Sequence, residues 1–383
     1  MPCKHISAPR KWQSSRCTAG LLVFAMLAPF ILLAQNPYWN EFGNKPVFIE
    51  QNNSGNRQML KFVAYRDNML VAEMKLNNPD GSTSIAEIAQ PVSESMVRTL
   101  NFQIKALRKA YQLIDGGNHI GAVKLLRPQV YPLVKFHQVP ESFIQLHQPV
   151  RLLIDSLIKA GELAEAEDLL NRIALEKVDL QYSENAQALL LAYQQQEDFD
   201  SLARVAGTLP VSGAYAGNIR PLINAADALR GAGYYDAVVP LYRAIQSVVD
   251  PSVKKNIDLW LAYSLVLANQ LEEANILIEG IAEPQPGDSL FSLYKLLHGS
   301  RLHRMERYGE ALDTLTRGFV RAQTSYSWVP EMLYLIGDCY LRAEDPVAAK
   351  SVWLEVVALY PRSPWAGRTN EALKALPKPE NTP

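Results

Sequence analysis

The apolar positions follow two different periods along the chain, and each period predicts its own kind of structure. Between residues 57 and 92, short apolar runs such as Met59–Tyr65 and Met69–Met74 alternate with turn residues, including Asn78-Pro79-Asp80-Gly81. This arrangement is typical of β-strands joined by tight turns, so we expect a small β-rich module of three strands there. From residue 93 to residue 376 the apolar residues recur at helical spacing, which predicts helices throughout.

The helical part of the sequence repeats itself. A small residue lies near the start of the second helix of most predicted hairpins, as in Leu163-Ala164-Glu165-Ala166 and Tyr308-Gly309-Glu310-Ala311. The register positions are 122, 166, 202, 237, 274, 311 and 349, at intervals of 44, 36, 35, 37, 37 and 38 residues. Such near-constant intervals indicate a stack of about seven helix-turn-helix repeats over residues 93–376. The helix that begins at Pro364, with Ser363 as its N-cap, is expected to cap the last repeat.

The last repeat has the most specific spacing. It reads Leu333-x-x-Ile336-Gly337-x-x-Tyr340, followed by Ala349-x-x-x-Trp353 and Pro361. This series resembles the tetratricopeptide pattern position by position, with Leu in place of the first Trp and Trp in place of Phe. The C-terminal repeats are also similar to those of bacterial periplasmic and outer-membrane-associated proteins, such as the Tol-Pal-associated cell-division coordinator and the outer-membrane assembly lipoproteins. The resemblance implies an all-α, right-handed α-solenoid, here preceded by the small β-rich module.

The first 34 residues differ from the rest of the chain. Lys4, Arg10, Lys11 and Arg16 precede Leu21–Ala34, an apolar run of 14 residues, whereas a membrane-spanning helix needs about 20. This order is typical of a secretory signal peptide, with an uncleaved single-pass anchor as the alternative. We therefore expect an exported protein, periplasmic or in the cell envelope if bacterial. Residues 35–56 are polar and predict a linker, and residues 377–383 predict a disordered tail.

Charge and cysteine usage narrow the possible functions. The formal net charge is −1, and removal of four of the 38 basic residues with the leader makes it −5. Without a concentrated basic face, a nucleic-acid partner is not expected. Cys3 and Cys17 lie in the leader, so Cys339 alone cannot form an internal disulfide. The sequence contains no recognisable catalytic, phosphate-binding or metal-binding motif, so we expect no enzyme activity, cofactor or metal.

The remaining candidate is a protein-binding surface. The resemblance implies that the first helix of each hairpin, helix A, lines a concave groove that holds a peptide or a partner protein. The positions carried over for this groove are Arg230, Tyr263, His303, Arg304, Asp338 and Arg342. Arg230, Arg304 and Arg342 share one offset in the repeats. They either face acidic or C-terminal carboxylate groups of a partner or cap the negative end of helix A.

The preferred interpretation is therefore a non-enzymatic interaction scaffold of the cell envelope with a protein or peptide partner. The alternatives are a membrane-tethered structural or assembly factor with an uncleaved anchor, and an accessory module of an envelope enzyme.

Overall fold

The computed structural model describes residues 36–53, 56–91, 100–101, 104, 106–140, 146–178 and 180–376. The leader over residues 1–34 and the tail over residues 377–383 lie outside these residues, so their predicted roles remain predictions. The chain divides into two compact units, Met1–Asn36 and Pro37–Pro383, and the following description concerns the second. In the described part of the chain, no helix combines the length and the apolar character needed to cross a membrane.

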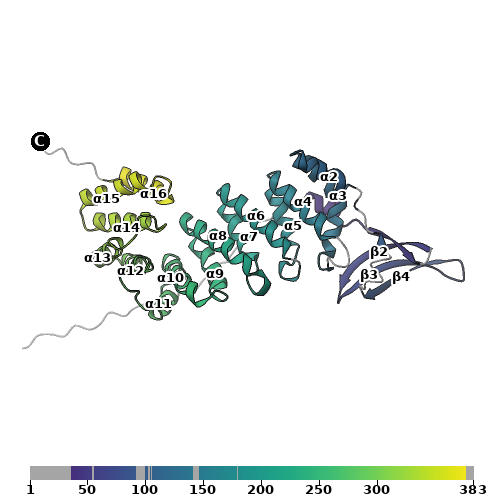
Figure 1. The fold of residues 1–383 in the computed structure, drawn as a ribbon, viewed down its shortest axis with the longest axis horizontal. Coiled ribbons are helices and arrows are strands. Elements are labelled where there is room, and N and C mark those ends of the chain that lie inside the picture. Colours follow the sequence, from purple (N-terminus) through teal and green to yellow (C-terminus); the bar gives the residue numbers. More distant parts are fainter. Residues whose placement is uncertain are drawn as a thin grey trace, which may run out of the picture. The chain divides into compact units, whose positions relative to one another are not determined.

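An antiparallel sheet forms the N-terminal part of this unit (Figure 1). Its order is β4-β3-β2-β1-β5, and the strands are β1 (Val47–Asn53), β2 (Asn56–Arg66), β3 (Met69–Asn77), β4 (Thr83–Pro91) and β5 (Leu100–Asn101). The predicted Asp67-Asn68 turn joins β2 to β3, with φ of 53° and 59°. This backbone conformation is typical of a two-residue hairpin turn. The predicted β-rich module is confirmed, although it has more strands than the three expected.

The structure contradicts the prediction of a linker over residues 35–56. A short π-helix, η1 (Trp39–Gly43), and all of β1 fall within or at the end of this range. The Tyr38 ring packs against the guanidinium of Arg127 at 3.9 Å, and the Trp39 ring lies 6.1 Å from that of Tyr131. The polar side chains of this segment suggested a linker, but a strand is held by hydrogen bonds between backbone groups, which polar side chains do not prevent. For the same reason β5, which pairs with β1, interrupts the region predicted to be wholly helical.

The described residues from 106 onward form seven helical hairpins and a final helix (Figure 1). The hairpins are α2 (Leu107–Asp115) with α3 (His119–Val130), α4 (His147–Lys159) with α5 (Leu163–Asn171), α6 (Gln181–Gln195) with α7 (Phe199–Thr208), α8 (Ile219–Ala232) with α9 (Tyr235–Gln246), α10 (Pro251–Leu267) with α11 (Leu271–Glu279), α12 (Phe291–Arg304) with α13 (Tyr308–Phe319), and α14 (Val329–Arg342) with α15 (Pro346–Leu359). Helix α16 (Pro364–Ala375) packs against α15 and α14. The structure thus confirms a solenoid of tetratricopeptide-like repeats.

The turn inside every hairpin has the same backbone conformation. One residue has a positive φ, and the next amide donates to the carbonyl five residues earlier, as Asp345 does to Tyr340 at 2.9 Å. This is the Schellman arrangement, which satisfies carbonyls at the end of helix A. The positive-φ residues are Gly117, Gly161, Glu197, Gly233, Asn269, Glu306 and Glu344.

These turns define the repeat register more accurately than the small residues do. The fifth residue after each positive φ is 122, 166, 202, 238, 274, 311 or 349, so one predicted position shifts from Ala237 to Val238. Val238 is 0% exposed, whereas Ala237 is only half-buried. The sequence is ambiguous here because Gly231 and Gly233 both could end α8, and only Gly233 takes the left-handed conformation, with φ 93°.

The two helices of a hairpin cross closely where the tetratricopeptide pattern has its small residues. A Cβ atom added to Gly337 would lie 2.3 Å from Nε1 of Trp353, and one added to Gly299 would lie 2.4 Å from Cγ of Leu315. Ala349 and Trp353 are buried on the facing helix. The predicted reason for the small residues, a close crossing of helix A and helix B, therefore holds in the last two repeats.

Candidate functional site

The corrected register changes the predicted series of arginines. Arg304 and Arg342 each lie two residues before a positive-φ residue, whereas Arg230 lies three residues before Gly233. Gly231, not Arg230, therefore occupies the equivalent position in the fourth repeat. The proposed recurrence of arginine in three repeats is wrong, and it reduces to a pair in the last two.

Arg230 instead lies at the centre of a buried cluster that joins the fourth repeat to the seventh. Its Nη1 is 3.5 Å from a carboxylate oxygen of Glu331 in α14, and its Nη2 is 3.4 Å from Oδ1 of Asp227. Its guanidinium lies 3.6 Å from the ring centroid of Trp260, and the hydroxyl of Tyr263 donates to Glu331. We call Asp227, Arg230, Trp260, Tyr263 and Glu331 the Arg230 cluster.

The electrostatics of the Arg230 cluster follow from its burial. Arg230 is 7% exposed and Glu331 is 1% exposed. Burial raises the pKa of Glu331 above its usual value, against the opposing effect of the Arg230 charge. Burial also raises the pKa of Tyr263, so the tyrosine stays protonated and donates its hydrogen bond. Arg230 and Tyr263, two of the predicted groove residues, therefore bind groups of the protein itself.

The other four predicted groove residues lie on α12 and α14. Nε2 of His303 is 2.6 Å from Oδ2 of Asp338, and Nε of Arg342 is 3.7 Å from the same oxygen. Although burial opposes the change, His303 and Arg342 lower the pKa of Asp338 below its usual value. Exposed Arg304 donates from Nη2 to the backbone carbonyl of Leu267 at 3.0 Å, at the end of α10. Arg304 thus fits the alternative interpretation, in which arginine caps a helix end.

An open groove lies earlier in the array, on the helix A surfaces of the first four repeats. Two adjoining pockets of about 350 Å³ each form it. Residues of α2, α4 and α6 line the first pocket, residues of α6 and α8 line the second, and Glu184 lines both. We call these two pockets the helix A groove.

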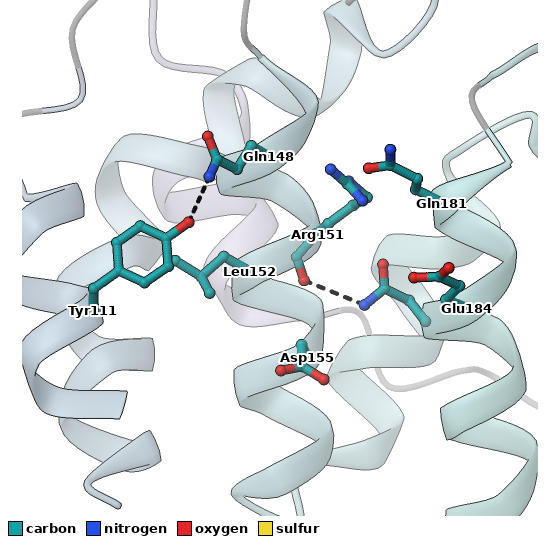
Figure 2. A pocket seen from close by; sticks show the side chains of 8 residues that line it. Tyr111, Gln148, Arg151, Leu152, Asp155, Gln181 and Glu184 are labelled. Atoms are coloured by element: carbon teal, nitrogen blue, oxygen red, sulfur yellow. Dashed lines mark hydrogen bonds between the residues drawn. The ribbon is translucent and has the colours of Figure 1, made fainter. Parts of the chain in front are cut away.

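The first pocket of the groove contains polar groups from three helices (Figure 2). Nε2 of Gln148 donates to the hydroxyl of Tyr111 at 2.6 Å, and Nδ2 of Asn185 donates to the carbonyl of Arg151 at 3.3 Å. Asp155 pairs with Lys159 on its own helix, with 2.7 Å between the charged atoms. These contacts fix the amide side chains around Arg151.

Two polar atoms of this pocket lack a hydrogen-bond partner among the described residues. Nε of Arg151 and Oδ1 of Asn185 are both shielded from solvent. A shielded, unpaired polar group costs roughly 1–3 kcal/mol. No described carboxylate forms an ion pair with Arg151, and Glu184, on the neighbouring helix, likewise forms none with a described cation. The pocket therefore contains one cation and one anion whose hydrogen-bonding capacity is not used within the described part of the protein.

Sequence reasoning missed this groove, although a usable signal was present. Tyr111, Asp155 and Leu191 lie six residues before their positive-φ residues, the same offset as Tyr263 and Asp338. The predicted offset thus identified a real helix A surface. It was applied only to the last four repeats, where Tyr263 contributes to the Arg230 cluster and Asp338 pairs with His303.

The described residues offer little for chemistry outside the groove. They contain no group of three or more His, Cys, Asp or Glu side chains placed to hold a metal ion. Cys339 is fully buried, and burial raises the pKa of its thiol to about 12. A thiol with this pKa is protonated at neutral pH and is a poor nucleophile. Cys339 is therefore a packed residue of α14 and not a reactive thiol.

Comparisons with known proteins give fold-level likeness. No protein-family model matches the chain, and no curated protein matches it. Among solved structures, a tetratricopeptide repeat protein from Parabacteroides merdae is 13% identical, with a TM-score of 0.39, over 70% of this chain and 96% of that chain. The APC/C hetero-tetramer Cut9-Hcn1 is also 13% identical, with a TM-score of 0.37, over 73% of this chain and 54% of that one. At this level of identity the matches concern the fold alone.

Proposed function

We propose that this chain is a non-enzymatic interaction scaffold of the cell envelope, which holds a peptide or a partner protein in the helix A groove of its first four repeats. One observation carries the proposal. The helix A surface of α4, α6 and α8 has open pockets with polar side chains that are not fully satisfied, while Arg230 and Tyr263, on the later helix A surface, are committed to the Arg230 cluster.

The size of the groove supports a segment of polypeptide as the ligand. Together the two pockets extend across four neighbouring A helices, and packed helices lie about 8–10 Å apart. The lining is mostly uncharged, with Gln and Asn side chains beside Leu, Ala and Pro. Such a surface suits a chain that offers both backbone polar groups and apolar side chains.

The location in the cell envelope is supported by the basic and apolar leader. Intact-mass measurement on protein isolated from its native cells tests this part of the proposal. A mass that lacks the first 34 residues is the expected result. A mass that includes them would favour the membrane-tethered assembly factor, which uses the same groove from a fixed position.

Site-specific photocrosslinking in native cells tests the groove. A photoreactive residue at Leu191, which lines the second pocket and is 55% exposed, is expected to capture a partner protein. The matched control carries the same residue at Leu354, which is 50% exposed on α15 and outside the groove. Equal capture at both positions, or capture only at Leu354, would contradict the groove as the binding site.

A further inference from the structure

Helix α15 is apolar on two opposite sides, and the rest of the protein covers only one of them. Ala349, Trp353 and Val356 are buried on the covered side. On the opposite side, Val347 is 75% exposed and Leu354 is 50% exposed. Scattered exposed apolar residues are ordinary on a protein surface, but apolar residues in line along a helix form a face that another element can cover.

The exposed face is a straight stripe, with intervals of four, three and four residues between its members. At about 100° per residue, the stripe spans about 60° of the helix circumference. We call it the α15 stripe, and its residues, all exposed, are Val347, Ser351, Leu354 and Ala358. This spacing is that of the a and d positions of a two-stranded coiled coil. Ser351 suits such a contact, because its Oγ already donates to the carbonyl of Val347 at 3.0 Å and its burial leaves no unpaired hydroxyl.

Two charged residues border the α15 stripe on opposite sides. Lys350 lies about 70° to one side of the centre of the stripe, and Glu355 lies about 70° to the other side. Both are exposed, and neither forms an ion pair with another described residue. Their separation of five residues is that of the g position of one heptad and the e position of the next, which pair between the helices of a parallel coiled coil.

These two charges are complementary in a parallel pair of identical helices. Around a twofold axis parallel to the helices, each flank of one helix meets the opposite flank of the other. Lys350 of one copy then faces Glu355 of the second copy, and the symmetry makes this contact twice. In an antiparallel pair like flanks meet, so that the positive side chains lie together on one side of the interface and the negative ones on the other.

We propose that two copies of this chain associate through the α15 stripe, with the two α15 helices side by side and parallel and with Lys350 of each copy paired to Glu355 of the other. The helix is already ordered by the packing of its covered side, so association requires no helix formation. With 14 residues, α15 is about 21 Å long. Two faces of this length bury less than the roughly 1,200 Å² of a stable complex, so the dimer forms and dissociates as the protein concentration changes.

The association is independent of the helix A groove, since no residue of the α15 stripe lines either pocket. One dimer therefore contains two grooves. A partner with two binding segments would bind such a dimer more tightly than it binds a single copy, because the second segment binds within the same assembly.

Sedimentation equilibrium of the protein purified from its native cells, over a wide range of concentration, tests the proposal. The average mass is expected to rise with concentration from that of one chain towards twice that value. Leu354→Gln is expected to weaken association by at least about tenfold, because it removes an apolar side chain from the interface in both copies. Ile276→Gln is the matched control, since Ile276 is 74% exposed on α11 and lies outside the α15 stripe. Circular dichroism shows whether each variant is folded.

An exchange of charges distinguishes the parallel pair from other modes of association. Lys350→Glu and Glu355→Lys are each expected to weaken the dimer by about tenfold, because two attractive pairs become two repulsive ones. The variant with both changes restores the two pairs with reversed charges, so its affinity is expected to lie within about threefold of the original. A protein that stays monomeric at every concentration, or a double variant that associates as weakly as the single ones, overturns the proposal.

Photocrosslinking in native cells identifies any other occupant of the α15 stripe. A photoreactive residue at Leu354 is expected to give a product with twice the mass of the chain. A crosslink within a single chain, or to a protein of different mass in the absence of this product, reveals another occupant and overturns the proposal. Capture of a second copy differs in mass from capture of a foreign protein, so Leu354 remains a valid control for Leu191 in the helix A groove.

Discussion

Replacement of Gly337 by alanine should destabilise the protein, although alanine is the better helix former. Gly337 lies inside α14, where alanine is favoured over glycine by about 1 kcal/mol. The added Cβ would however lie 2.3 Å from Nε1 and 2.5 Å from Cδ1 of Trp353. Carbon atoms in contact are about 3.5–4.0 Å apart, so one group must move by more than 1 Å.

Trp353 has little freedom to make this movement. Its side chain is 1% exposed, and Nε1 donates to the carbonyl of Tyr334 at 3.0 Å. Overpacking of a tight core costs roughly 1–3 kcal/mol, and a buried donor that loses its acceptor costs roughly 1–3 kcal/mol more. After subtraction of the gain in helix propensity, we expect Gly337→Ala to lower the free energy of unfolding by about 1–5 kcal/mol.

The assay is urea unfolding monitored by circular dichroism and tryptophan fluorescence, with the midpoint and slope compared between variants. Gly367→Ala is the matched control, because Gly367 lies in α16 and a Cβ there would have no atom within 4 Å. This control should stabilise the protein by about 0.5–1 kcal/mol. In a Trp353→Phe background, Gly337→Ala should cost less, since the smaller ring leaves space for the new methyl group. If Gly337→Ala and Gly367→Ala change the free energy of unfolding in the same direction, the close crossing does not explain why glycine occupies position 337.

Three further predictions concern buried charge, backbone conformation and pH. Arg230→Met and Glu331→Met should each lower the free energy of unfolding by about 3–5 kcal/mol. The double variant should recover most of this lost stability, which a double-mutant cycle measured by urea unfolding would show. Glu344→Gly should raise the free energy of unfolding by about 0.5–1 kcal/mol, because φ of 62° strains a side chain but not glycine; an unchanged urea midpoint would contradict this. Burial, together with Arg301 and Lys295, lowers the pKa of His298 to about 4, below its unfolded value of about 6.5. Its contribution to stability is therefore present above about pH 6.5 and is lost as the pH falls towards 4, and His298→Gln should reduce the slope of the urea midpoint against pH in that interval.

Local patterns in the sequence predicted most of the fold. The hairpins, their number and six of the seven register positions follow from small residues and turn residues that recur at short range, such as Gly161 and Ala166. The single error in register arose at Gly231 and Gly233, where only the observed φ shows which glycine ends the helix. Strand β1 was missed because its polar side chains resemble those of a linker, while its structure depends on backbone pairing with β2.

The candidate site was harder to predict because it depends on long-range contacts. Arg230 and Glu331 are 101 residues apart, and no periodic pattern shows that they form an ion pair. Because the sequence does not show this contact, the groove was assigned to the last four repeats, which match the tetratricopeptide pattern most regularly. The open surface lies instead where the repeats match the family pattern less well, and Arg151 and Glu184 carry no motif that distinguishes them from ordinary surface charges.

The link between the fourth and seventh repeats also limits how this array can change in length. In most solenoids a repeat contacts only its neighbours, so whole repeats can be duplicated or deleted with little effect on the others. Here a repeat gained or lost between α8 and α14 would separate Arg230 from Glu331 and break the buried ion pair between them. A change in the number of repeats is therefore expected to destabilise the protein more between α8 and α14 than before α8.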